Sequence, residues 1–199
     1  MINSIRGTRG MATAPHALAA QSALAVLREG GNALEAMIAA ASTIAIVYPH
    51  MNSIGGDSFW LVHVPGQDVQ GIDASGANAQ AATLDWYRAR NITTAIPFRG
   101  GVAANTVAGT VSGWDAAFQR SRELGGKLPL SRLLGDAIHY ATHGIPVTVS
   151  QQNATTAKRA ELEPQPGFTE AFLPCGIVPP AGSLFVQKKM ATTLERLAS

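Results

Sequence analysis

Two histidines four residues apart form the first pattern that could carry chemistry. His139 and His143 fall on one face of an expected helix, so both rings could bind a single metal ion. The zinc-protease pattern also needs a glutamate after its first histidine, but Tyr140 stands there, and no third ligand is evident. We therefore expect no metal and no cofactor. We expect His143 to lie near the last carbonyl groups of its helix, where a partly cationic ring is favoured.

Glycine pairs form the second pattern. Gly109 and Gly113 have the spacing of a hydrolase nucleophile elbow, but Val111 stands where that motif needs serine. We expect tight backbone packing there, or exposed N–H groups that bind an anion ahead of a helix. Gly55 and Gly56 lack the Lys-Ser/Thr ending of a phosphate loop, so they predict a tight turn.

Two aspartates near expected strand ends, Asp57 and Asp73, could serve in acid–base chemistry. The sequence shows no paired carboxylate and no Ser/His/Asp ordering to support that role. Aspartates in such positions more often orient loops through hydrogen bonds, and this is the competing interpretation.

Helical and extended patterns alternate along the chain and would position these groups. Helices are expected over residues 15–29, with Pro15 tolerated in the first turn, and from Asn32 to Pro49, where Asn32 and Glu35 have capping-box spacing. Further helices are expected over 83–90, 114–124, 130–142 and 189–197, two strands over 58–64 and 69–74, and mostly loop from Glu163 onward. This order favours an α/β or α+β layer fold.

Composition excludes several classes of protein. Of 199 residues, 46% are hydrophobic and 14% charged, and the formal net charge is +2. This argues against disorder, and against nucleic acid or an anionic membrane as the main partner. Cys175 is the single cysteine, so a disulfide within the chain and a cysteine-built zinc site are excluded.

The amino terminus and the most apolar stretch bear on location. Residues 1–7 lack the apolar core of a secretory signal, so we expect a cytoplasmic protein. Residues 33–47 are too short to span a bilayer and include Glu35, so they are interpreted as a buried helix.

Several phrases, in order, resemble the amino-terminal part of the γ-glutamyltransferase family. Together they extend over most of the chain, and the order in which they occur makes the resemblance specific. They are MATAPH at 11–16, LREGGNALEAMIAA at 27–40, YPH at 48–50 with SIGGDSF at 53–59, GTV at 109–111, GKLP at 126–129 and GIPV at 144–147.

The resemblance implies an α+β, N-terminal-nucleophile hydrolase fold, an αββα sandwich of which residues 1–199 would be the N-terminal portion of the large subunit. Family members are made as precursors that cut themselves and free a threonine, which heads the small subunit and attacks an amide to form an acyl-enzyme. No segment of this chain resembles that threonine-headed motif. We therefore expect a fragment that is inactive alone, or else a non-catalytic relative or separate subunit that pairs with another chain.

One departure from the family pattern bears on the substrate. In the transpeptidases the phrase that resembles residues 71–76 carries an arginine that clamps the α-carboxylate of the γ-glutamyl group, and here Ser75 stands in that place. A neutral hydroxyl cannot replace a bidentate guanidinium. The resemblance then implies a small carboxylate amide, oxamate among the examples, with glutathione-type γ-glutamyl substrates as the alternative. It places Ser75, Asp73, Asn52 and Ser53 near the substrate. The competing interpretation is that Ser75 caps a turn and that Asn52 and Ser53 satisfy the backbone of a buried turn.

Overall fold

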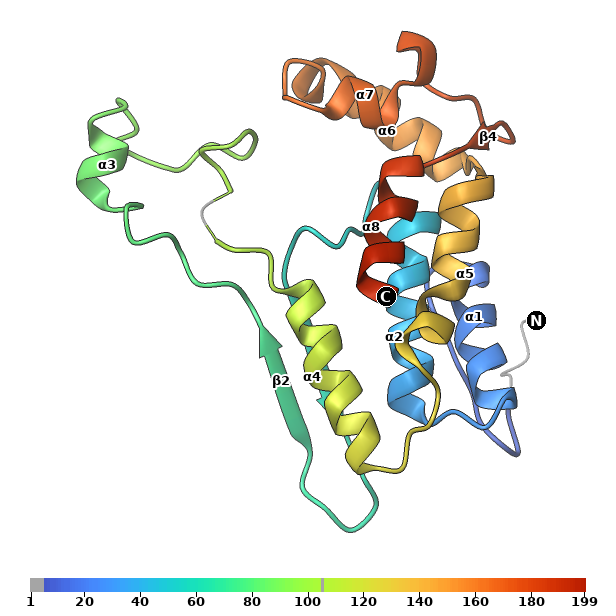
Figure 1. Ribbon diagram of the computed structural model, residues 1–199. Coiled ribbons are helices and arrows are strands. Elements are labelled where there is room, and N and C mark those ends of the chain that lie inside the picture. The colour runs from blue at the N-terminus through green and yellow to red at the C-terminus, as the bar shows by residue number, and fades with distance from the viewer. Residues whose placement is uncertain (1–5, 105) are drawn as a thin grey trace. The chain divides into compact units, whose positions relative to one another are not determined.

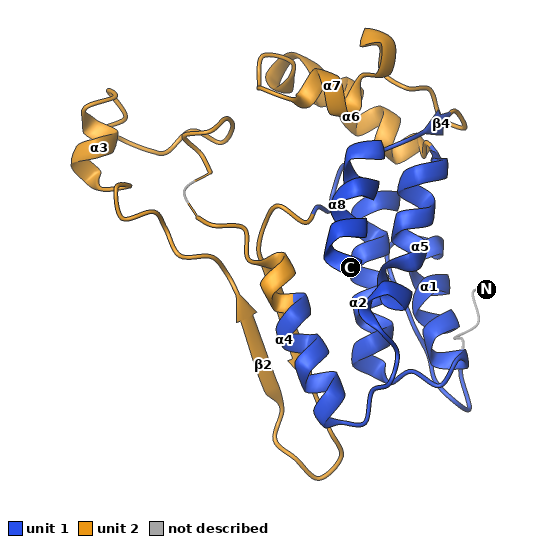
Figure 2. Ribbon diagram, in the orientation of Figure 1, with its two compact units in different colours: residues 1–53, 114–146, 184–199 blue, residues 54–113, 147–183 orange. Residues whose placement is uncertain are grey.

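The computed structural model describes residues 6–104 and 106–199, and its elements mix helices with short strands (Figure 1). Contacts divide the chain into two compact units (Figure 2). Unit 1 comprises residues 1–53, 114–146 and 184–199, and unit 2 comprises residues 54–113 and 147–183. Each unit is therefore assembled from segments far apart in the sequence.

Four helices form the core of unit 1. They are α1 (Ala17–Arg28), α2 (Ala33–Val47), α5 (Leu130–His143) and α8 (Lys188–Ala198). Helix α2 packs against α1 and α5, and α5 packs against α8 (Figure 1). Alanines give α2 a thin surface, and Ala36, Ala39 and Ala40 are buried where the neighbouring helices approach. The buried helix expected over residues 33–47 is confirmed.

The N-termini of α1 and α2 are both capped by local side chains. Asn32 and Glu35 form the predicted capping box: the Asn32 side chain accepts the Glu35 N–H at 3.0 Å, and the Glu35 carboxylate accepts the Asn32 N–H at 2.8 Å. The expected start of α1 at Pro15 is wrong by two residues. His16 is the N-cap instead, because its Nδ1 accepts the N–H of Leu18 at 3.2 Å.

Helix α4 (Thr110–Glu123) begins one turn earlier than residue 114, where the sequence predicted it. At its first turn the Gly109 carbonyl accepts the Gly113 N–H at 3.0 Å and the Ser112 hydroxyl at 2.7 Å. Unit 1 is completed by two short strands, β3 (Ile145–Pro146) and β4 (Leu184–Phe185), which pair antiparallel.

Unit 2 contains the predicted hairpin. Strands β1 (Ser58–Val62) and β2 (Gln70–Ala74) pair antiparallel, with Ser58 opposite Ala74. Beyond β2, Asn78 forms an isolated bridge with Thr106, so the chain returns alongside itself before α4.

The remaining elements of unit 2 are helical. The helix expected over residues 83–90 is the short helix α3 (Leu84–Arg88), which Thr83 caps. Helix α6 (Val149–Leu162) was not predicted, because its sequence is rich in Gln, Asn and Thr and has little apolar periodicity. Helix α7 (Phe168–Phe172) and a 3-10 turn (Pro174–Gly176) also interrupt the stretch expected to be mostly loop.

Among the described residues, no helix combines the length and apolar character needed to cross a lipid bilayer. Residues 1–5, within the terminus that lacks a secretory pattern, lie outside the described residues.

Candidate functional site

The carboxyl end of β2 brings together two of the predicted site residues. The Asp73 carboxylate accepts the backbone N–H of Ser75 at 2.9 Å. The side chain of Ser75 also hydrogen-bonds to this carboxylate, and the two interactions, the side-chain one first, lower the pKa of Asp73 below its ordinary value. Both residues are exposed. Asp73 is therefore an ionised, solvent-facing acceptor whose neighbour is held in place by it.

A second aspartate holds the next residue. The Asp57 carboxylate accepts the Gly76 N–H at 3.3 Å. Asp57 thus orients a loop, which is the competing interpretation to a role in acid–base chemistry. At this turn, two aspartates accept hydrogen bonds from consecutive backbone N–H groups, those of Ser75 and Gly76.

Tight backbone packing fixes the position of this turn. A Cβ on Gly76 would overlap the Val107 carbonyl, and a Cβ on Gly109 would overlap the Ala74 carbonyl. The Val107 N–H donates to the Ala77 carbonyl at 3.0 Å, which ties the two segments together. Only glycine permits this approach, because any side chain would collide with backbone atoms.

The same packing explains both glycine patterns. The Thr110 N–H and hydroxyl donate to the Gly56 carbonyl at 2.8 and 2.7 Å, so Gly56 lies in a turn braced by the start of α4. A Cβ on Gly113 would approach Ala74 to 2.8 Å and would overlap the Ser58 hydroxyl. Of the two interpretations left open for this segment, tight packing is confirmed.

Asn52 and Ser53 belong to unit 1, whereas Asp73 and Ser75 belong to unit 2, so each pair is described with its own unit. The Asn52 N–H donates to the Tyr48 carbonyl at 3.1 Å, just beyond the end of α2. Asn52 is half-buried and Ser53 is exposed. The structure brings Asp73 and Ser75 into contact, and a substrate role for Asn52 and Ser53 stays a prediction.

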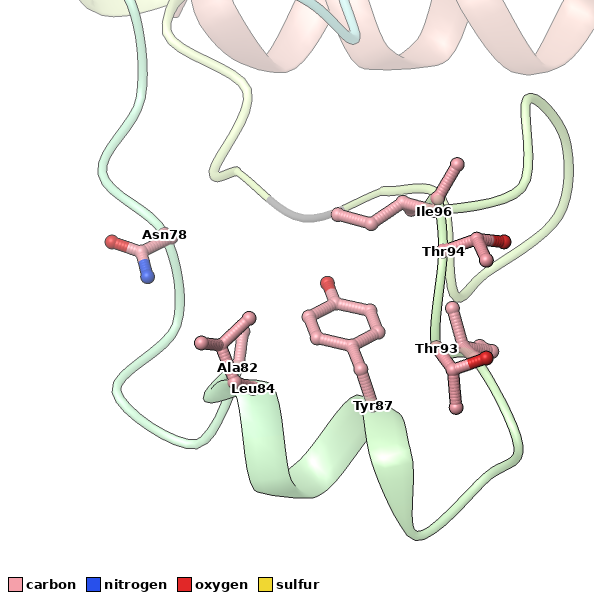
Figure 3. Close-up of a pocket in the computed structure, with 9 residues that line it drawn as sticks. Asn78, Ala82, Leu84, Tyr87, Thr93, Thr94 and Ile96 are labelled. Atoms are coloured by element: carbon pink, nitrogen blue, oxygen red, sulfur yellow. The ribbon is translucent and has the colours of Figure 1, made fainter.

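A cavity of about 330 Å³ beside α3 was not predicted from the sequence. Figure 3 shows Tyr87 pointing into it, with Asn78 on one side and Thr93, Thr94 and Ile96 on the other. Tyr87 is 8% exposed. The isolated threonines and the asparagine gave no signal in the sequence, because the loop after α3 brings them together.

The histidine pair lies as predicted on α5. The ring centroids of His139 and His143 are 4.5 Å apart, and Nδ1 of His143 lies 3.0 Å from the His139 carbonyl, in the last turn of the helix. The expected position of His143 is confirmed. Over residues 6–104 and 106–199, no group of three or more His, Cys, Asp or Glu side chains is placed to hold a metal ion.

Comparison with families and curated proteins gives consistent matches. Residues 19–199 match the family model described as gamma-glutamyltranspeptidase. The whole chain is 57% identical over 200 residues to the oxamate amidohydrolase proenzyme of Klebsiella pneumoniae, covering 37% of that protein. It is 38% identical over 199 residues to the glutathione hydrolase-like YwrD proenzyme of Bacillus subtilis, again covering 37%. The chain thus spans just over a third of the length of these two relatives.

Solved structures of the same family have a fold similar to that of this chain. The Helicobacter pylori gamma-glutamyltranspeptidase superposes with a TM-score of 0.88 at 27% identity, over 98% of this chain and 56% of that one. This similarity confirms the expected α+β fold, of which the present chain supplies a part.

Proposed function

Because the chain belongs to the gamma-glutamyltranspeptidase family, we propose that the protein containing it is an autoprocessed amide hydrolase with a threonine nucleophile. The fold is the N-terminal-nucleophile hydrolase fold predicted from the sequence. In the proposed reaction, a freed threonine attacks the amide carbonyl, forms an acyl-enzyme and releases the amine, and water then releases the acid. The threonine and the second subunit that it heads belong to sequence outside these 199 residues.

The proposed substrate is a small carboxylate amide such as oxamate. The observation that carries this choice is the 57% identity, over the entire chain, to a relative named for oxamate hydrolysis. A relative named glutathione hydrolase-like is 38% identical, and one named glutathione hydrolase is 34% identical. They support γ-glutamyl substrates as the alternative.

The interaction of the Ser75 side chain with Asp73 suits a substrate amide that donates hydrogen bonds. A serine hydroxyl has one proton, and in its contact with the ionised Asp73 carboxylate the hydroxyl is the donor. Its oxygen can then only accept, which suits the N–H groups of a primary carboxamide. It does not suit a carboxylate, which also only accepts and would face the charge of Asp73. We therefore propose Ser75 and Asp73 as substrate contacts that favour a neutral amide over an α-carboxylate, and Asn52 and Ser53 as further proposed substrate contacts.

The experiment compares two substrates on the intact protein from its native source. We expect release of ammonia and oxalate from oxamate, and slow cleavage of a γ-glutamyl anilide. The intact mass should show two chains made by cleavage of one precursor. Faster turnover of the anilide than of oxamate would instead support the γ-glutamyl alternative. An uncleaved protein that turns over neither substrate would identify a non-catalytic relative.

A further inference from the structure

We propose that the cavity beside α3 is a binding site for a small, uncharged molecule that has an apolar body and one hydrogen-bonding group. This goes beyond the proposed hydrolase activity, because it concerns a different set of side chains and its binding can be measured without turnover.

The lining decides the charge of the ligand. Apolar and neutral polar side chains surround the cavity, and none of the described residues that line it is charged. A charged ligand would lose its hydration without gaining an opposite charge, which is unfavourable. The ligand that this lining fits is therefore neutral, in contrast to the carboxylate-bearing substrate proposed for the reaction.

One polar group points into the cavity, and other neutral polar side chains lie along its lining. Figure 3 shows the Tyr87 hydroxyl directed into the cavity, with Asn78 on one side of it and Thr94 and Ile96 on the other. A phenolic hydroxyl both donates and accepts, and so does an asparagine amide. An apolar cavity with a small number of such groups is the usual form of a small-molecule site.

The walls are held by backbone hydrogen bonds rather than by side chains alone. Asn78 is fixed by its bridge to Thr106. The Ile92 N–H donates to the Tyr87 carbonyl at 3.1 Å, and Asn91, with φ of 59°, makes the left-handed turn that reverses the chain after α3. These bonds hold the segments that surround the cavity, whose volume of about 330 Å³ is at the small end of the range for ligand sites.

The test uses benzamide and benzoate as probes, because they have the same shape and differ in charge. Binding is followed by amide chemical shifts of the intact protein, with the oxamate reaction assayed separately. We expect saturable shifts in residues 78–96 with benzamide. We expect benzoate to bind at least about tenfold more weakly than benzamide. Failure of the hydrolase proposal would leave this result unchanged.

Three variants locate the binding. Ala82→Trp fills the cavity and should abolish benzamide binding, and Tyr87→Phe removes only the hydroxyl and should weaken it several-fold. Arg88→Ala, on the same helix but outside the lining, is the matched control and should bind as the parent does. The melting temperature of each variant reports whether it folds, and Tyr87→Phe keeps the test valid if Ala82→Trp does not. Absent benzamide binding, equal binding of benzoate, or undiminished binding by both cavity variants would overturn the proposal.

Discussion

The carboxylate of Glu35 accepts the backbone N–H of Leu128 at 2.8 Å, across 93 positions of sequence. The same carboxylate accepts the Asn32 N–H, and Glu35 is fully buried. The acidic position of the GGNALEA segment is therefore a structural tie that joins the start of α2 to the turn after α4.

Glu35→Ala should lower the free energy of unfolding by about 3 kcal/mol, because it leaves two N–H groups without their acceptor in the interior. Chemical denaturation of the intact protein measures the change. Glu195→Ala, at an exposed position of α8, is the control and should change stability by less than about 0.5 kcal/mol. Equal effects of the two substitutions would show that the hydrogen bonds of Glu35 add nothing to the free energy of unfolding.

Gln151 and Gln152 make a matched pair at the start of α6. Gln151 is 1% exposed, and neither polar atom of its side chain has a hydrogen-bond partner among the residues that the structure describes. Gln152 instead accepts the Ala181 N–H at 2.8 Å. Gln151→Met should raise the free energy of unfolding by about 1 kcal/mol, since it removes an unsatisfied buried amide, and Gln152→Met should lower it by a similar amount. A loss of stability in Gln151→Met would indicate an ordered water bound to the amide.

Acidification should weaken unit 1 through two histidines. Burial lowers the pKa of His16 below its ordinary 6.5, and burial together with the charge of His16 lowers the pKa of His50. Below pH 6.5 the unfolded chain thus binds more protons than the folded one, so stability is complete above about pH 6.5 and is lost as the pH falls. Protonation of His16 at Nδ1 would also remove the acceptor that caps α1.

The substitution His16→Asn tests this dependence, because asparagine caps a helix without titrating. We expect a smaller loss of stability between pH 7.5 and 5.5 than in the parent, measured by denaturation at each pH. The range stays above the values at which the carboxylates titrate. His63→Asn, at an exposed position, is the control. An unchanged pH dependence in His16→Asn would refute the role of the cap.

Ser75→Arg should shift activity from oxamate toward γ-glutamyl anilides. A guanidinium restores a bidentate partner for an α-carboxylate, worth about tenfold or more in the ratio of the two kcat/KM values. Ser75→Ala is the control, since it removes the hydroxyl without adding a charge. If the ratio of activities stays the same in Ser75→Arg, Ser75 lies away from the substrate.

Gly76→Ala should destabilise unit 2 by about 2 kcal/mol or more, because its Cβ would overlap the Val107 carbonyl. Gly101→Ala meets open space and should have little effect. Melting temperatures of the two variants decide the point. Equal melting temperatures would mean that the segments containing Gly76 and Val107 can move apart without a loss of stability.

Much of the local structure could be predicted from the sequence. The capping box of Asn32 and Glu35, the hairpin of β1 and β2 and the place of His143 each depend on residues close in the chain, whose preferences act over a few positions. The order of the motif blocks likewise predicted the family, and Ser75 stands out by its type alone.

Tertiary structure decided the rest. Helix α6 carries little apolar periodicity, so its fourteen residues were missed. The tie from Glu35 to Leu128, the contact of Gly76 with Val107 and the cavity around Tyr87 join residues that no local pattern links. Hydrogen-bond donors that face inward must find acceptors wherever the chain happens to pass, and that meeting depends on the whole packing rather than on neighbouring residues.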